Sequence, residues 1–168
     1  MSTFVAVNTY THSVTYVTDN ILRSLQDIVK LSGLDPSKIS EEWAVLERGI
    51  RTWIDSKHLE AIVLEVYNLT TDALIGRWDI EIAYEWSGDN GRFWVDTDQI
   101  KAAIKKAGAW PSESKYRIVC TTKDGRAVVE GWSSTNLRST SGLIKQSLGT
   151  TIEHSGLGAG ASYYRKKP

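Results

Sequence analysis

The residue types that most often carry out catalysis are few and scattered in this chain. His12, His58, His154 and Cys120 show none of the spacings typical of metal sites or of a nucleophile with its base. Cys120 lies on the apolar face of an alternating run, which favours a buried and inert thiol. His58 follows a predicted helix, where the helix dipole favours a cation. We therefore expect no catalytic residue, no metal, no cofactor and no enzymatic activity.

Two groups of carboxylates could suggest a metal site, but their positions in predicted elements explain them more simply. Asp96 and Asp98 open a predicted helix, one as its capping residue and the other in its first turn. Asp79, Glu81 and Glu85 share the polar face of an alternating run, and we expect that face to be solvated.

The stretch GLGAG, at residues 156–160, superficially resembles a phosphate-binding loop. Such loops lie between a strand and a helix N-terminus, whose N–H groups point at the anion. Only eight residues follow Gly160, and no Gly-Lys-Ser/Thr is present. We interpret the stretch as backbone that must bend, with a disordered tail as the alternative. Ile152, Tyr163 and Tyr164 argue against a disordered tail, because they would be left in water.

Composition narrows the class of protein. The 168 residues suit one domain. The 20 basic and 20 acidic residues give no net charge that would attract nucleic acid or anionic lipid. The start MSTFVAVNTY does not have the pattern of a signal peptide, and no apolar run has the length of a membrane span. The single cysteine suits a reducing compartment. We expect a soluble cytoplasmic protein without a membrane partner.

Apolar residues at spacings of three and four predict three helices. Gly33 ends the first, Asp35 caps the second, Asp96 with Gln99 forms a capping pair for the third, and Gly108 ends it. The predicted helices cover residues 11–31, 35–56 and 95–108.

Alternating runs predict an antiparallel hairpin and two further strands. In the second strand of the hairpin, Trp78 and Ile80 fall on one face while Arg77 and Asp79 fall on the other, which predicts one wet face. The predicted strands cover residues 60–68, 74–86, 114–122 and 127–132. Residues 133–168 are rich in Ser, Thr and Gly and show no obvious helix, and loops of this length are uncommon unless they are functional or disordered.

The order of these elements, together with the blocks YTHSVTYVTDNILRSLQDI and KQSLGTTIEHSGLG, resembles the bacterial HORMA domains. The resemblance spans nearly the whole chain. It implies an α+β fold in which three helices pack on an antiparallel sheet and a C-terminal safety belt follows. The single domain at 1–168 would then comprise a flexible N-terminal segment at 1–10, a core at 11–130 and the safety belt at 131–168.

The resemblance also implies a regulatory function. In this family the safety belt wraps around a short peptide, the closure motif, and the complex binds and activates a cGAS/DncV-like nucleotidyltransferase (CD-NTase) in CBASS antiphage signalling. An AAA+ ATPase remodeler engages the N-terminal segment and disassembles the complex. By this likeness the remodeler would engage Ser2, Thr3, Phe4 and Val5.

The peptide would add as a strand to the sheet edge formed by residues 115–122, with affinity from main-chain hydrogen bonds. We expect Tyr116, Ile118 and Cys120 to face the helices. The predicted peptide-binding residues are Lys115, Arg117, Val119 and Thr121 on the edge strand and Leu143, Ile144, Leu148 and Ile152 in the belt.

The cost of ordering the belt bears on how it binds. Ordering costs on the order of 1–2 kcal/mol per residue in backbone entropy. Unless the bound peptide supplies all of the compensating free energy, the belt must already contact the sheet in the empty protein. Two packings of similar free energy would make it a conformational switch. We also expect that deleting the residues from about Ser133 onward abolishes peptide capture and leaves a folded core.

A single-stranded nucleic-acid-binding module is the alternative function. The Trp and Tyr side chains of this chain could stack on bases. Such a module also needs a basic face, and the zero net charge makes nucleic acid the less favoured partner.

Overall fold

The computed structural model describes residues 9–87 and 93–166, and all structural statements below concern these residues. The helices are α1 (Tyr10–Leu31), α2 (Ser37–Glu41), α3 (Trp43–Asp55) and α4 (Asp98–Ala107). The strands are β1 (Leu59–Asn68), β2 (Leu74–Tyr84), β3 (Phe93–Val95), β4 (Ser114–Thr122), β5 (Leu143–His154) and β6 (Leu157–Lys166).

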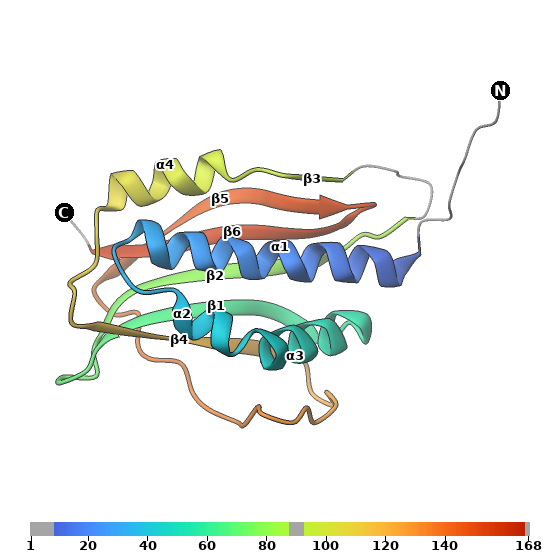
Figure 1. The fold of residues 1–168 in the computed structure, drawn as a ribbon, viewed down its shortest axis with the longest axis horizontal. Helices are drawn as coiled ribbons and strands as arrows, with labels where there is room; N and C mark the ends of the chain where they lie inside the picture. Colours follow the sequence, from blue (N-terminus) through green and yellow to red (C-terminus); the bar gives the residue numbers. More distant parts are fainter. Residues whose placement is uncertain (1–8, 88–92, 167–168) are drawn as a thin grey trace.

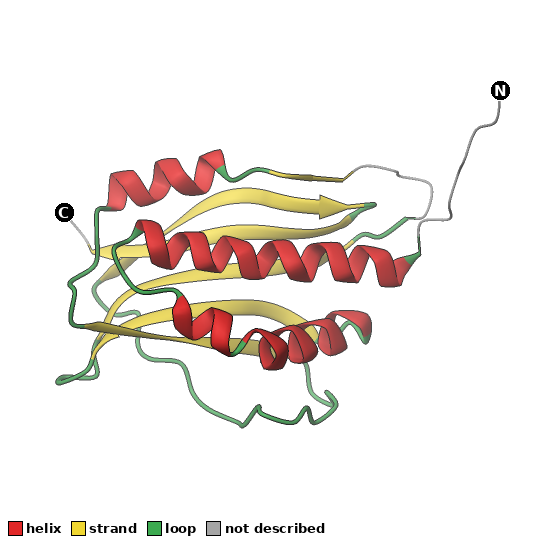
Figure 2. Cartoon of the chain, in the orientation of Figure 1, coloured by secondary structure: helices red, strands yellow, loops and turns green. Residues whose placement is uncertain are grey.

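The described strands form one antiparallel sheet in the order β3-β5-β6-β2-β1-β4. The helices lie over one face of this sheet, with α1 across its middle, as Figures 1 and 2 show. The predicted α+β class and the β1–β2 hairpin are confirmed.

The long helix α1 forms because its apolar residues fall on one stripe that the sheet can bury. Val17, Ile21 and Leu25 are fully buried. The hydroxyl of Thr9 accepts a hydrogen bond from the His12 N–H at the N-terminus. Gly33 follows the helix with a φ of 91°, in the left-handed region that favours glycine, as predicted.

The second predicted helix is two helices in the structure. The chain leaves helical geometry at Glu42, where α2 ends and α3 begins. The Asp35 carboxylate accepts a hydrogen bond from the Ser37 N–H, which lowers the pKa of Asp35. The predicted cap is therefore one residue early, because α2 begins at Ser37 with Pro36 as its N-cap, and the Asp35 carboxylate supports the turn that leads into the helix.

The third predicted helix is confirmed as α4. The Asp96 carboxylate accepts hydrogen bonds from the backbone N–H groups of Asp98 and Gln99 and from the Gln99 side chain. Gly108 follows the helix with a φ of 83°.

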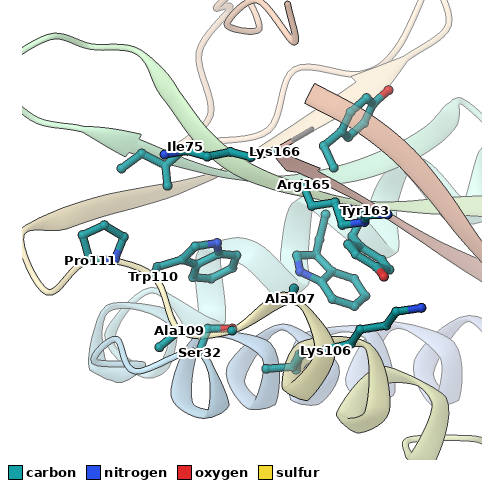
Figure 3. Close-up of a pocket in the computed structure, with 14 residues that line it drawn as sticks. Ser32, Ile75, Lys106, Ala107, Ala109, Trp110, Pro111, Tyr163, Arg165 and Lys166 are labelled. Atoms are coloured by element: carbon teal, nitrogen blue, oxygen red, sulfur yellow. The ribbon is translucent and has the colours of Figure 1, made fainter. Parts of the chain in front are cut away.

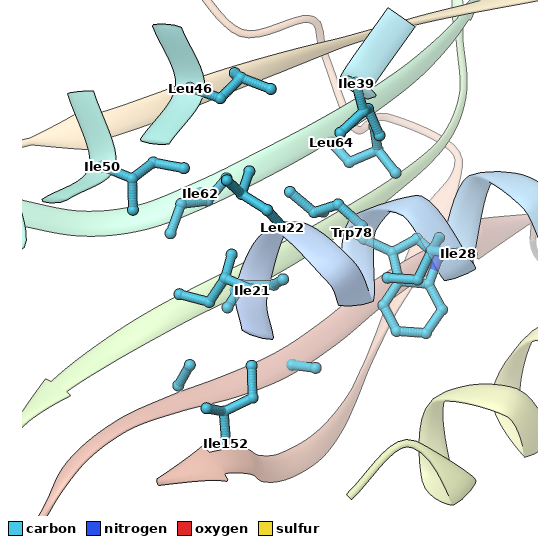
Figure 4. Packing of buried hydrophobic residues seen from close by; sticks show 14 of the residues in the cluster. Ile21, Leu22, Ile28, Ile39, Leu46, Ile50, Ile62, Leu64, Trp78 and Ile152 are labelled. Atoms are coloured by element: carbon cyan, nitrogen blue, oxygen red, sulfur yellow. The ribbon is translucent and has the colours of Figure 1, made fainter. Parts of the chain in front are cut away.

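The hydrophobic core lies between the helices and the sheet. Figure 4 shows Ile21, Leu22 and Ile28 from α1 meeting side chains from β1, β2 and β5. Ile62 and Leu64 are the β1 contribution, and Ile152 comes from β5. The last two strands therefore share one core with the N-terminal helix.

The face of the sheet opposite the helices is only partly exposed to solvent. This corrects the expectation that the polar face of the alternating strand is solvated throughout. Asp79 is 4% exposed, and its carboxylate forms a two-point ion pair with Arg77. Glu65 and Val63 are also buried on this side. Glu81 and Glu85 are exposed, as predicted.

The C-terminal region forms a hairpin, β5–β6, that pairs with β2. Its tight turn places Ser155 at a φ of 52° and Gly156 at 92°, and a Cβ on Gly156 would collide with the Glu85 carbonyl. The chain therefore bends at Gly156, whereas Gly158 and Gly160 are extended within β6, contrary to the expectation that the whole stretch bends. The C-terminal region thus contacts the sheet through β6, which pairs with β2.

One predicted strand is absent from the described residues, and one strand was not predicted. Residues 127–132 do not form a strand, because the chain turns there and the Trp132 N–H bonds to the Val129 carbonyl. The short strand β3, which pairs with β5, was not predicted, because its sequence shows no alternation of apolar and polar residues. Its three residues are too few to show a period.

We expect a chain that ends at residue 142 to lose cooperative folding, contrary to the expectation that residues 11–130 fold alone. The missing hairpin carries the buried residues Ile152, Leu157 and Tyr163, and burying each such side chain contributes about 1.5–3 kcal/mol. Total stabilities are only about 5–15 kcal/mol. Thermal unfolding followed by circular dichroism tests this.

The full-length Val128→Ala variant is the control for this truncation, because Val128 is 89% exposed. Its free energy of unfolding should lie within about 0.5 kcal/mol of that of the parent protein. A truncated chain with a cooperative transition and native near-ultraviolet signals would contradict the prediction.

Candidate functional site

The strand β4 lies at one end of the sheet and pairs with β1 alone among the described strands. The Tyr116 carbonyl accepts a hydrogen bond from the Lys38 ammonium group at 3.2 Å, so it points away from β1. Backbone groups alternate in direction along an antiparallel strand, so those of Ile118 and Cys120 point the same way. Within 9–87 and 93–166, no backbone hydrogen bond joins them to another segment. This edge can accept a further strand.

The side chains of β4 face as predicted. Tyr116, Ile118 and Cys120 pack against the core on the helix side. The Tyr116 hydroxyl donates to the Asp35 carbonyl, and burial raises the pKa of Tyr116 to about 12. Burial also raises the pKa of the Cys120 thiol, which suits an inert cysteine.

The β4–β5 connection, residues 123–142, passes along this edge and crosses behind the sheet (Figure 1). Its first anchor is Trp132, whose indole N–H donates to the Val45 carbonyl of α3 at 2.9 Å. The indole meets Trp53 edge to face, with ring centroids 5.1 Å apart. Gly49 makes room for it, because a Cβ at that position would collide with the Trp132 ring.

The second anchor of the β4–β5 connection is the carboxylate of Glu65 on β1, which is fully buried. Arg117 of β4 donates to it at 2.6 Å, and the backbone N–H and guanidinium of Arg138 donate at 2.6 and 2.9 Å. Arg117 also donates to Thr135 and to the Asn136 carbonyl. Charge-assisted bonds of this kind are the strong ones, and here they hold the connection to the sheet.

Arg138 also contacts residues other than Glu65. Its guanidinium donates to the Asp72 carboxylate at 2.9 Å and lies 3.6 Å from the centre of the Tyr67 ring. Burial lowers the pKa of Arg138, but the hydrogen bond to Asp72 and the charges of Glu65 and Asp72 outweigh it and raise that pKa. Arg138 therefore stays charged and links the connection to β1 and to the β1–β2 turn.

A cavity of about 200 Å³ lies between the two anchors. Trp53 of α3, Ile118 and Cys120 of β4, and Arg126 and Trp132 of the connection line it. Arg126 stacks over the Trp53 ring at 5.2 Å. The cavity thus has aromatic walls and one cationic side chain next to the outward edge of β4.

The predicted peptide-binding residues fall into two separated groups. Lys115, Arg117, Val119 and Thr121 lie on β4, where Arg117 belongs to the second anchor and Val119 is buried. Leu143, Ile144, Leu148 and Ile152 lie on β5, with β6, β2 and β1 between that strand and β4. Ile152 is fully buried in the core. The structure therefore does not bring the two groups together, because the hairpin pairs with β2 at the other side of the sheet.

The residues predicted to engage a remodeler, Ser2, Thr3, Phe4 and Val5, lie outside the described residues. Within the described ranges, no helix is long and apolar enough to cross a membrane, and no cluster of His, Cys, Asp and Glu side chains has the size of a metal site.

One pair of side chains resembles a catalytic dyad. The Ser13 hydroxyl lies 2.7 Å from Nδ1 of His154, and the Trp86 indole N–H donates to the same hydroxyl. Ser13 is fully buried, and burial lowers the pKa of His154. The pair joins α1 to the end of β5, and the buried Ser13 hydroxyl contacts both His154 and Trp86 there.

Sequence reasoning missed Glu65, Arg138, Trp53 and Trp132 as site residues. A signal existed for Glu65, a lone carboxylate within the apolar run IVLEVY. A charge in such a run needs a partner once the strand is buried. The partners themselves come from distant segments and leave no local pattern.

The comparisons with known proteins agree with this architecture. The family model "Bacterial HORMA domain 2" matches residues 1–167. No curated protein matches the chain in sequence.

Several solved structures share the fold at low sequence identity. C. elegans HTP-2 bound to the HIM-3 closure motif is 10% identical, with a TM-score of 0.71 over 96% of this chain and 93% of that chain. A chain of the mitotic checkpoint complex is 12% identical, with a TM-score of 0.64 over 92% and 94%. A chain of the E. coli MS115-1 CdnC:HORMA-deltaN complex is 8% identical, with a TM-score of 0.61 over 99% and 94%.

Because the family model covers almost every residue and the sheet, helices and C-terminal hairpin have the arrangement of these structures, the chain belongs to the bacterial HORMA domain 2 family.

Proposed function

We propose that this protein captures an extended peptide as an additional strand on the outer edge of β4, beneath the β4–β5 connection. One observation carries the proposal: the outward backbone groups of Ile118 and Cys120 lie beside a connection that is anchored on both sides of them. A peptide placed there would gain main-chain hydrogen bonds and would be enclosed.

The similar structures support this proposal. HTP-2 is described as bound to a closure motif, and its fold matches nearly the whole of this chain. We propose that the peptide captured here is a closure motif of the same extended kind. The cavity beside β4 suits one apolar side chain against Trp53 and Trp132, and Arg126 suits a neighbouring acidic residue.

The assignment of peptide-binding residues changes accordingly. Lys115, Arg117, Val119 and Thr121 stay in the proposal as the strand that receives the peptide, while the main-chain groups of Ile118 and Cys120 make its hydrogen bonds. Leu143, Ile144, Leu148 and Ile152 instead belong to the hairpin that pairs with β2.

We further propose that the peptide-bound protein binds and activates a CD-NTase in CBASS signalling. The match to a chain of the CdnC:HORMA-deltaN complex supports this partner. Removal of the peptide would require the connection to open, because the connection passes along the proposed binding edge before it crosses behind the sheet. An AAA+ ATPase acting from the N-terminal segment would supply that opening, as the family resemblance implies.

Co-purification is the first test. We expect the protein, expressed with its neighbouring gene products, to retain a short peptide and to co-elute with a CD-NTase. Mass spectrometry identifies the peptide. Size-exclusion chromatography with and without the peptide tests whether co-elution with the CD-NTase depends on it. Co-elution that is equally strong without any peptide would contradict the proposed order of binding.

Amide hydrogen exchange measured by NMR tests the binding edge itself. We expect the retained peptide to slow exchange at Ile118 and Cys120 by about tenfold or more, since a new hydrogen bond must open before exchange. The alternate residues Arg117 and Val119 point towards β1 and serve as internal controls. Protection along β5 with an unchanged β4 would refute the assignment.

The Arg138→Ala variant tests the second anchor. Breaking a buried ion pair costs about 3–5 kcal/mol, and Arg117 still compensates Glu65, so we expect about 2 kcal/mol of lost anchoring. Peptide dissociation, followed by fluorescence anisotropy, should accelerate about tenfold or more.

Lys145→Ala is the matched control for Arg138→Ala. It removes a cation whose ion pair with Glu81 is solvent-exposed and contributes at most about 1 kcal/mol. Equal dissociation rates for both variants would show that the second anchor does not hold the peptide.

A further inference from the structure

A second cavity, of about 370 Å³, lies at the end of the molecule where α4, β2 and β6 meet. Figure 3 shows Trp110 and Tyr163 on two sides of it, with Lys106 contributed by the end of α4. Its volume lies in the range of small-ligand sites. Sheet order separates this cavity from the peptide edge, because β1 lies between β2 and β4.

Aromatic side chains form the walls of this cavity. Trp78 of β2 stacks on Tyr163 of β6, with ring centroids 5.0 Å apart and an angle of 24° between the planes. Both are almost fully buried. Trp110 lies directly over Gly76, where a Cβ would be 2.6 Å from its indole nitrogen. The glycine in β2 therefore allows the indole to lie against the sheet.

The charged residues that line the cavity carry positive charge. Lys106, Arg165 and Lys166 line the cavity, and none of the described residues that line it is acidic. The whole chain carries equal numbers of acidic and basic residues, so this is a local excess of positive charge. Aromatic walls and a lining with cationic residues complement a flat apolar group that carries a negative charge.

We propose that this cavity binds a small aromatic anion, a planar ring that carries a phosphate, carboxylate or sulfonate group. The ring lies against Trp110 and the Trp78–Tyr163 stack, and the anion meets Lys106 and Arg165. This binding is separate from peptide capture on β4.

The position of the cavity gives binding a structural consequence. Tyr163 and Arg165 come from β6, whereas Trp78 comes from β2, so the site is complete only while the C-terminal hairpin pairs with β2. A ligand that binds one packing alone stabilises that packing. Occupancy therefore holds the hairpin in the position that leaves β4 free.

Titration with 8-anilinonaphthalene-1-sulfonate, an aromatic sulfonate whose fluorescence rises in apolar surroundings, tests the site. We expect one saturable site per chain and a higher thermal midpoint when it is filled. The neutral analogue N-phenyl-1-naphthylamine should bind about tenfold or more weakly, because it lacks the charge. Adenosine 5′-monophosphate and indole-3-acetate, as competitors, distinguish a phosphate from a carboxylate preference.

Two variants locate the site. Lys106→Gln and Trp110→Leu should each weaken sulfonate binding about fivefold or more. Lys105→Gln is the matched control, because Lys105 lies in the same turn of α4 and does not line the cavity. The absence of a saturable site, or equal affinities in Lys106→Gln and Lys105→Gln, would overturn the proposal, whatever the outcome for peptide binding.

Discussion

The buried carboxylate of Glu65 is the constraint on which the rest of the structure depends. An ionised group without solvent needs opposite charges and hydrogen bonds, and Arg117 and Arg138 provide them. Arg138 belongs to the β4–β5 connection, a segment otherwise exposed along most of its length. The need to compensate one charge thus orders a polar segment that has little hydrophobic area of its own to bury.

The two ends of the sheet differ, and this difference leaves the edge of β4 on which we propose that the peptide binds. At one end the C-terminal hairpin completes the sheet by pairing with β2. At the other end, β1 is the one neighbour of β4 among the described strands, and exposed edges of this kind invite unwanted pairing. Lys38 covers the Tyr116 carbonyl and the connection passes alongside, so the edge is shielded without being filled. A guest strand can replace this shielding with hydrogen bonds of its own.

Much of the fold could be predicted from periodicity, and the exceptions have physical causes. The stripe of α1 and the alternation of β2 bury one face each, so their patterns are visible locally. In β6 the alternation is hidden, because the buried residues Ala159 and Ala161 are small and only Gly160 stands between them. The predicted direction of the Tyr116, Ile118 and Cys120 side chains agrees with the structure. The structure separates β4 from β5, and the sequence did not show this, since apolarity in a Ser- and Gly-rich region does not reveal a pairing partner.

The sequence by itself determined the class of the protein: helices and strands of definite type, an edge strand with a helix-facing side, and a chain without the spacings of a catalytic or metal site. Only the tertiary structure decided that the hairpin pairs with β2 and that Glu65 holds the connection. The reason is how far apart in the sequence the interacting residues are. Helical and strand periodicity arise between residues a few positions apart, whereas Arg138 and Trp132 find their partners 73 and 87 positions away. Such contacts depend on burial and charge in three dimensions, and no local pattern encodes them.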